Sequence, residues 1–131
     1  MAQLQLDIIT PTQTLVHREV DYVSATGMGG EFGIMPGHVP MFAALKVGQL
    51  HFRIGDAVQY IFICQGFLEV MGNRVTVLTE VAEMAEDIDV NRADKARERA
   101  EGRLRGTECN VVRAKAALVR AVERIHVVAI T

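Results

Sequence analysis

Four arginines in the last third of the sequence have spacings that could place them around an anion. Arg92 and Arg99 are seven residues apart, and Arg120 and Arg124 are four residues apart. Both spacings put side chains on one face of an α-helix. If the two segments pair as antiparallel helices, the guanidinium groups gather and repel one another unless an anion or solvent screens them. A polyphosphate is such an anion, because guanidinium binds phosphate oxygens in bidentate fashion.

Spacing alone leaves two other interpretations of these arginines open. They can be solvated side chains with local Asp and Glu partners, the common state of a charged helix face. They can also meet an acidic partner, because the charge of the chain is uneven. Residues 1–87 carry ten acidic and four basic residues, a net charge of −6, whereas residues 88–131 carry six acidic and ten basic residues, a net charge of +4. This asymmetry indicates two parts with different roles.

The residue types argue against several other classes of function. The one serine, Ser24, lies outside any Gly-x-Ser-x-Gly motif, so a nucleophile-elbow hydrolase is not expected. Neither the histidines nor the two cysteines have metal-ligand spacing, so we expect no metal site. No aromatic residue follows Phe67 and the net charge is −2, which argues against nucleic-acid binding. No uncharged stretch approaches the roughly 20 apolar residues of a membrane-spanning helix.

A glycine-rich stretch, residues 26–40, reads Thr-Gly-Met-Gly-Gly-Glu-Phe-Gly-Ile-Met-Pro-Gly-His-Val-Pro. No Gly-Lys-Ser/Thr follows it, and Phe32 occupies the third glycine position of a dinucleotide fingerprint, so neither phosphate-binding motif fits. Two interpretations remain open. The stretch can form tight turns at the end of a β-structure, or a shaped loop that docks another protein. In the second case His38, in the rigid corner 37–40, is a candidate contact.

The elements that must position these residues are strands up to residue 87. Leu4, Leu6 and Ile8 alternate with other residues, which predicts a strand with one inward face. A β-rich run follows at residues 15–25. Four shorter strands flank the turn pairs Gly55-Asp56 and Gly72-Asn73; we predict them at residues 50–54, 57–63, 67–71 and 75–78. Short strands separated by glycine turns are typical of a β-sandwich or barrel.

The pattern becomes helical after Ile88. Asp89 is a favourable N-cap, and the first helix is predicted to run to about Arg105. Its inner face consists of Ala93, Ala96, Ala100 and Leu104, and Glu101 and Arg105 are spaced as an ion pair.

A second helix follows a turn at Gly106, with Thr107 or Asn110 as its cap. Its apolar seam consists of Val111, Ala114, Leu118, Ala121, Ile125 and Val128. Because a lone two-helix hairpin buries little surface, it must dock on the sandwich, on a partner, or on each in turn.

Two motifs carry a resemblance that covers the whole chain. Residues 30–40 resemble the Gly-Ile-Leu-Pro-Gly-His signature of the epsilon subunits of F-type ATP synthases, with Met35 where Leu is usual. Residues 88–93, Ile-Asp-Val-Asn-Arg-Ala, resemble the Ile/Leu-Asp-x-x-Arg-Ala motif with which the family's helical hairpin begins. Residues 45–50 also fit the family pattern. We therefore expect an all-β sandwich domain over residues 1–87, followed by a two-helix antiparallel hairpin over residues 88–131.

The resemblance implies a non-catalytic rotor subunit of a bacterial, proton-translocating ATP synthase. Its sandwich is expected to pack on the gamma subunit and on the polar loops of the membrane c-ring, and to pass torque between them. The implied location is peripheral, at the cytoplasmic face of the plasma membrane and only through the complex. The implied c-ring-facing loop consists of Glu31, Phe32, Gly33, Ile34, Met35, Pro36, Gly37 and His38.

The family's hairpin has two states, and the resemblance implies both here. Folded on the sandwich, it permits turnover; extended along gamma, it contacts the alpha and beta subunits and inhibits ATP hydrolysis. No cofactor is required, but some members bind regulatory ATP on the folded hairpin. The matching positions are Glu83, Ile88, Asp89, Arg92, Ala93, Arg99, Arg120 and Arg124. A free-standing enzyme or a carbohydrate-binding sandwich is the rival interpretation; the absence of tryptophan and of clustered His, Cys or Ser argues against it.

Overall fold

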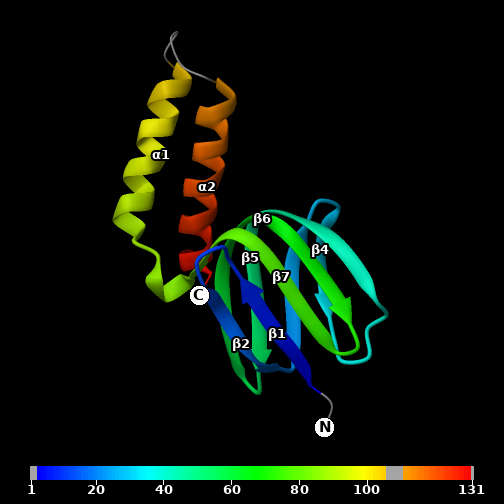
Figure 1. Cartoon of the computed structure of the whole chain (residues 1–131). Coiled ribbons are helices and arrows are strands. Elements are labelled where there is room, and N and C mark those ends of the chain that lie inside the picture. Colours follow the sequence, from blue (N-terminus) through cyan, green and yellow to red (C-terminus); the bar gives the residue numbers. More distant parts are fainter. Residues whose placement is uncertain (1–2, 106–110, 131) are drawn as a thin grey trace.

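A computed structural model of the chain describes residues 3–105 and 111–130. Within these residues seven strands form one sheet in the order β2-β1-β7-β6-β5-β3-β4, and two helices follow. The strands are β1 (Leu4–Ile9), β2 (Thr14–Val20), β3 (Tyr22–Gly27), β4 (Gly30–Ile34), β5 (Met41–Ile54), β6 (Ala57–Met71) and β7 (Arg74–Met84). A 3-10 turn, η1 (Ala85–Asp87), leads to the helices α1 (Val90–Arg105) and α2 (Val111–Ala129). Figure 1 shows the curled sheet with the two helices side by side at one end, which confirms the predicted sandwich and hairpin.

The sheet becomes a sandwich because its two longest strands bend. The pairing of β5 with β6 is interrupted between Leu45↔Gly66 and Gly48↔Ile63. At the interruption Gln65 and Gly66 have φ angles of 58° and 149°. Such a bend lets a strand pass from one layer to the other. The prediction of separate strands at 57–63 and 67–71 is therefore wrong: both belong to β6, and the glycine between them bends the strand without ending it.

A second crossing between the layers takes place at Asp21. The predicted run 15–25 is two strands, β2 and β3, which lie near opposite edges of the sheet. The Asp21 carboxylate accepts a hydrogen bond from the backbone N–H of Gly55 at 2.7 Å. That bond, followed by one from the Gln3 side chain, lowers the pKa of Asp21. Apolar residues continue on both sides of Asp21, so the hydrophobic pattern did not reveal the break.

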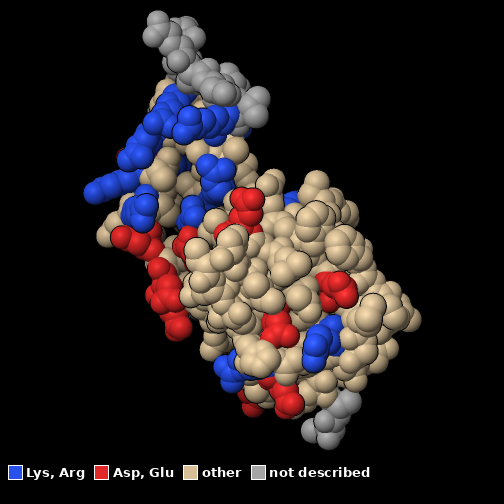
Figure 2. Space-filling view, viewed as in Figure 1, with Lys and Arg blue, Asp and Glu red and all other residues tan. Residues whose placement is uncertain are grey.

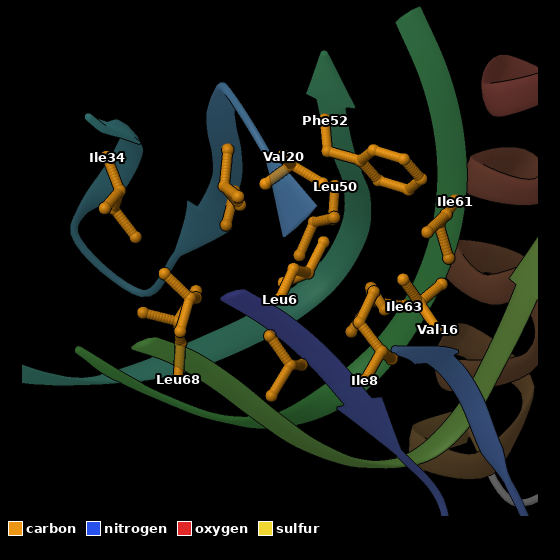
Figure 3. Packing of buried hydrophobic residues seen from close by; sticks show 14 of the residues in the cluster. Leu6, Ile8, Val16, Val20, Ile34, Leu50, Phe52, Ile61, Ile63 and Leu68 are labelled. Carbon is orange, nitrogen blue, oxygen red and sulfur yellow. The ribbon is translucent and has the colours of Figure 1, made fainter. Parts of the chain in front are cut away.

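The core lies between the two layers of the sheet. Leu4, Leu6 and Ile8 of β1 are fully buried, which confirms the alternation predicted for this strand. Figure 3 shows Leu6 and Ile8 pointing toward Leu50, Ile61 and Ile63 from β5 and β6. Burial of each such side chain contributes roughly 1.5–3 kcal/mol, so this core supplies much of the stability of the sandwich.

The predicted hairpin turns are confirmed, and one of them has an uncommon residue order. Gly55-Asp56 joins β5 to β6, with a φ of 59° at Gly55. Gly72-Asn73 joins β6 to β7, with φ angles of 55° and 60°. Two consecutive positive φ angles define a type I′ turn, in which glycine is usually the second residue. Here the second residue is Asn73.

The helices begin and pack largely as predicted. The Asp89 carboxylate caps α1 by accepting from the backbone N–H of Arg92 at 3.0 Å. Four small residues are buried where the helices meet: Ala93, Ala100, Ala114 and Ala121. Arg97 pairs with Asp94, and its Nε lies 3.9 Å from Oε1 of Glu101, so Glu101 has a positively charged neighbour within α1. Gly106, Thr107 and Asn110, and the side chains of Arg105 and Val111, lie outside what the structure describes.

Gly66 offers a direct test of the bend in β6. A Cβ atom added there would collide with the Leu78 carbonyl oxygen and lie 2.9 Å from the Thr79 Cα, in a conformation with positive φ. We expect Gly66→Ala to lower the free energy of unfolding by about 2 kcal/mol in urea denaturation. Gly29→Ala is the matched control, because nothing lies within 4 Å of its Cβ position; it should change stability by less than about 0.5 kcal/mol. Equal unfolding midpoints for the two variants would show that the backbone of β7 does not exclude a side chain at position 66.

Candidate functional site

A cleft of about 770 Å³ lies where β7, η1, α1 and the C-terminal half of α2 meet. Its lining residues are Glu83, Asp87, Ile88, Asp89, Asn91, Arg92, Ala93, Lys95, Ala96, Arg99 and Arg124. Seven of the eight positions predicted for a nucleotide are among them. The eighth, Arg120, is not; its charge, like that of Arg124, acts on the half-buried thiol of Cys64. Three of the four arginines therefore line the cleft, and the contribution of Arg120 to a ligand site stays a prediction.

The basic side of the cleft comes from one face of α1. The cap at Asp89 fixes where the helix begins and so sets Arg92 in its first turn. Lys95 and Arg99 follow at three and four residues, which keeps the three side chains on the same face. Within the part of the chain that the structure describes, none of the three forms a salt bridge with a carboxylate. Sequence reasoning missed Lys95, although the helical period that linked Arg92 to Arg99 passes through it.

Arg124 is held differently from these three residues. Its Nε and Nη2 atoms both donate to Oε1 of Glu83, at 3.1 and 2.9 Å. Its guanidinium carbon also lies 4.5 Å from the centre of the Phe62 ring. The side chains of Arg124 and Glu83 are only 26% and 31% exposed. This contact therefore joins α2 to β7 and β6 as well as lining the cleft.

The charges around the cleft are mixed. Figure 2 shows Lys and Arg gathered on the hairpin, with Asp and Glu below it near the junction with the sandwich. Glu83, Asp87 and Asp89 line the cleft at that junction. The Asp89 carboxylate accepts a hydrogen bond from the first turn of α1, and the Glu83 carboxylate accepts one from Arg124. These two carboxylates therefore already have donors. The positive charge of α1 is left available to a ligand, and the apolar atoms of Ile88 and Ala93 line the same cleft.

The predicted c-ring-facing residues do not form a single loop. Residues 31–34 belong to β4, an edge strand paired with β3. Ile34 is fully buried and Phe32 packs against the core, so neither is available to a partner as a loop residue. The prediction of one continuous loop is wrong because the glycines of this stretch permit close packing: a Cβ at Gly33 would collide with Tyr22.

The outward-facing part of this segment is Glu31 together with the turn 35–38. Oε1 of Glu31 accepts from Nε2 of Gln49 at 3.2 Å, and Gln49 also contacts Nδ1 of His51 at 3.0 Å. Burial lowers the pKa of His51, and the charge of Glu31 opposes that shift. Met35 is 60% exposed at the tip of the turn. The ring of His38 contacts the carbonyl oxygen of Val39, its own neighbour, at 2.7 Å.

Comparison with protein families identifies the two parts of the chain. The family model for the beta-sandwich domain of the "ATP synthase, Delta/Epsilon chain" matches residues 3–85, and the model for its long alpha-helix domain matches residues 86–129. The chain belongs to the ATP synthase delta/epsilon chain family. It is therefore a structural or regulatory subunit of ATP synthase and not itself catalytic.

Relatives of this family support the assignment over nearly the full length. An "ATP synthase epsilon chain" of Nitratidesulfovibrio vulgaris (strain DP4) is 47% identical over 126 residues, which are 95% of this chain and 94% of the relative. One from Syntrophobacter fumaroxidans (strain DSM 10017 / MPOB) is 46% identical over 127 residues, 95% of each chain.

A solved structure shares the fold. A chain in the cryo-EM structure of the Euglena gracilis mitochondrial ATP synthase aligns with a TM-score of 0.82 and 22% identity, covering 100% of this chain and 83% of that one. Neither helix within residues 3–105 and 111–130 has the length and apolar character needed to cross a bilayer.

A second hollow lies on the sandwich, away from the hairpin. It has a volume of about 640 Å³ and is lined by Ile9, Thr10, Pro11, Ala44, Leu45, Gln65, Gly66, Phe67, Leu78, Thr79 and Glu80. Beside it the rings of Phe42 and Phe67 stack at 5.3 Å although they are 66% and 49% exposed. Sequence reasoning missed this surface, because strand alternation places side chains on a face without revealing that both faces carry large apolar residues.

The hairpin docks on the sandwich through α2. Val127 is fully buried and packs in a cluster with Phe62, Ala85 and Ile88. The predicted seam of α2 omitted Val127, because that seam described the contact with α1 and not the contact with the sandwich.

Val127 allows the docking to be tested. We expect Val127→Ala to weaken it by about 1.5–2.5 kcal/mol, since two buried methyl groups are lost and a void is left. Hydrogen exchange should show faster exchange in α1 and α2 while the core strands keep their protection. Val122→Ala is the control, because it makes the same change in propensity at a side chain that is 43% exposed. Equal exchange in the two variants would show that Val127 does not anchor the hairpin.

Proposed function

We propose that the chain joins the gamma subunit to the polar loops of the c-ring in the central stalk, and that its hairpin regulates ATP hydrolysis. It would act as a peripheral component at the cytoplasmic face of a bacterial membrane, attached only through the complex. The observation that carries the regulatory part is the construction of the hairpin junction. The hairpin is docked through α2 by a small cluster around Val127 and by the contact of Arg124 with Glu83 and Phe62.

The apolar hollow with Phe42, Phe67 and Leu78 is the surface we assign to gamma. Exposed apolar side chains of this size, gathered on one face, mark protein interfaces more often than free surface. Leu78 is 51% exposed, and Met71, the last residue of β6, is 60% exposed. A partner that packs there would bury aromatic side chains that otherwise face solvent, which is the usual centre of a stable interface.

The segment that we assign to the c-ring is Glu31 with the turn 35–38. Glu31, Met35 and Gly37 are exposed; Glu31 is held by the pairing of β4 with β3, and the turn by a hydrogen bond from the N–H of Gly37 to Asn73. A carboxylate beside a rigid turn suits polar loops as a partner, because charged and hydrogen-bonding groups fix the register of an interface.

The contacts that dock the hairpin are weak enough for it to move. Full burial of one valine contributes roughly 1.5–3 kcal/mol, and a cation–π contact of a partly buried arginine about 0.5–2 kcal/mol. A docked state held by a few such contacts can exchange with an undocked state when a partner binds the latter. The net charge of +4 over residues 88–131 favours an acidic surface on the alpha and beta subunits as that partner.

Two variants with opposite expected effects test the regulatory role in reconstituted ATP synthase. A chain ending at Asp87 should raise the rate of ATP hydrolysis severalfold, because the inhibitory segment is gone. Val127→Ala should lower the rate, because it releases the hairpin from the sandwich and leaves it free to inhibit. Steady-state hydrolysis by the complex, with Val122→Ala as the control, measures both. An unchanged rate after deletion would contradict an inhibitory hairpin.

A regulatory nucleotide is a second candidate function of the same hairpin. The cleft offers three basic side chains for phosphate oxygens, namely Arg92, Lys95 and Arg99, and apolar contacts at Ile88 and Ala93 for a base. Because the cleft combines residues of β7, α1 and α2, it exists only while the hairpin is docked. We propose that ATP binds there and favours the docked state.

Calorimetric titration of the full chain with ATP, with ADP as the comparison and with and without magnesium, tests this proposal. We expect Arg92→Gln and Arg99→Gln each to weaken ATP binding about tenfold or more, since a charge-assisted hydrogen bond contributes about 1.5–3 kcal/mol. Lys115→Gln removes the same charge from an exposed position outside the cleft and should have little effect. No binding up to millimolar ATP would contradict the site and leave the hairpin as a purely mechanical brake.

A further inference from the structure

The exposed turn 35–38 has one backbone donor that the turn itself does not use. The N–H of His38 donates to the carbonyl oxygen of Met35 at 3.1 Å, which closes the turn. Pro36 occupies the second position and Gly37, with a φ of 86°, the third, which is the arrangement of a type II turn. In such a turn the N–H of the third residue has no partner within the turn. It therefore needs an acceptor from elsewhere, and here that N–H belongs to Gly37.

Asn73 supplies the acceptor. Its Oδ1 atom accepts from the N–H of Gly37 at 2.7 Å, across 36 residues of sequence. Its own carbonyl oxygen accepts from the N–H of Gln5 at 2.8 Å, so the backbone of Asn73 is tied to β1. Among the residues that the structure describes, the bond to Asn73 is the only hydrogen bond that joins residues 35–40 to another element.

The residue order of the β6–β7 turn agrees with a role for this side chain. Asn73 stands at the second position of a type I′ turn, where glycine is favoured and would leave the backbone unstrained. Asparagine tolerates the left-handed conformation and also carries an acceptor, which glycine lacks. Glycine would suit the turn better than Asn73 does, but only Asn73 can accept the hydrogen bond from Gly37.

We propose that Asn73 is a positioning residue that fixes the turn 35–38 against the sandwich, so that Glu31 and the turn meet a partner as one rigid surface. The proposal rests on the proposed function, in which this surface faces the c-ring. β4 fixes Glu31 through its pairing with β3, but that pairing ends at Ile34. Beyond Ile34 the Asn73 side chain holds the turn in place, because it links Gly37 to the start of β7 and, through its own carbonyl oxygen, to β1.

Two substitutions at Asn73 distinguish the effect of its side-chain hydrogen bond from the effect of the backbone conformation of the β6–β7 turn. Asn73→Gly keeps the left-handed backbone and removes the acceptor, so the fold is not at risk. Asn73→Asp keeps an acceptor of the same shape and serves as the conservative rescue. Amide hydrogen exchange of the full chain by NMR should show Gly37 exchanging about two- to tenfold faster in Asn73→Gly, the range that one hydrogen bond supplies. Core amides of β1 should be unchanged, and Asn73→Asp should restore the protection of Gly37.

The same variants are then assembled into ATP synthase, and the ratio of proton pumping to ATP hydrolysis is measured. We expect a lower ratio with Asn73→Gly and the original ratio with Asn73→Asp, a difference that a purely local effect on the turn would not produce. Unchanged exchange at Gly37, or an unchanged ratio despite faster exchange, overturns the positioning role.

A third variant shows where a failure lies. Gly37→Val forces a β-branched side chain into a φ of 86° and so breaks the turn itself. If Gly37→Val lowers the ratio and Asn73→Gly does not, the turn is functional but Asn73 does not position it. If neither variant changes the ratio, the segment does not meet a partner that matters for coupling, and the c-ring assignment fails together with the proposal.

Discussion

The docking of α2 on the sandwich is the constraint on which the arrangement of the two parts depends. The cluster around Val127 holds it, and the contact of Arg124 with Glu83 and Phe62 joins α2 to two strands at once, through two hydrogen bonds to one carboxylate oxygen and a stacked guanidinium. α1 packs on α2, so the position of α1 against the sandwich follows from how α2 docks. The cleft in turn needs Glu83 from β7 and Arg92 and Arg99 from α1. Without the docked α2 these residues would not share a cavity.

The composition of this junction differs from that of the sandwich core, and the difference has consequences for motion. The core is made of fully buried aliphatic and aromatic side chains from both layers. The junction has four buried residues, two of them alanine or valine, and an ion pair that is partly exposed. Ion pairs that solvent reaches contribute little, roughly 0–1 kcal/mol. Local stability therefore falls from the sandwich to the hairpin, which is the order expected if the hairpin is the part that moves.

The sequence predicted those features that depend on local pattern. Alternation located β1, glycine pairs located two turns, and Asp89 located the start of α1. It did not predict features that depend on contacts across the fold. The sequence around Gly66 was interpreted as the end of a strand, because a glycine is typical both of a strand end and of a bend within a strand. The break at Asp21 was hidden by continuous β-rich sequence, since the partner that stabilises it, Gly55, is 34 residues away.

The candidate site shows the same limit. Helical spacing correctly brought Arg92 and Arg99 to one face, and Lys95 could have been added by the same rule. Spacing could not decide which way α2 turns against the sandwich, and that rotation puts Arg124, but not Arg120, in the lining of the cleft. The exposed aromatic pair Phe42 and Phe67 was also out of reach, because only the register of β5 on β6 brings the two rings together.

The location of the cleft links any ligand to the position of the hairpin by thermodynamic necessity. A ligand shifts an equilibrium only as far as its affinities for the two states differ. Because the cleft draws on β7, α1 and α2 together, undocking removes part of the lining, and a ligand bound there must favour the docked state. Linkage is reciprocal, so a partner that holds the hairpin away from the sandwich weakens ligand binding by the same factor. The Arg124–Glu83 pair limits the size of this coupling, because a ligand that takes Arg124 for itself must first replace Glu83, which lowers its affinity for the docked state.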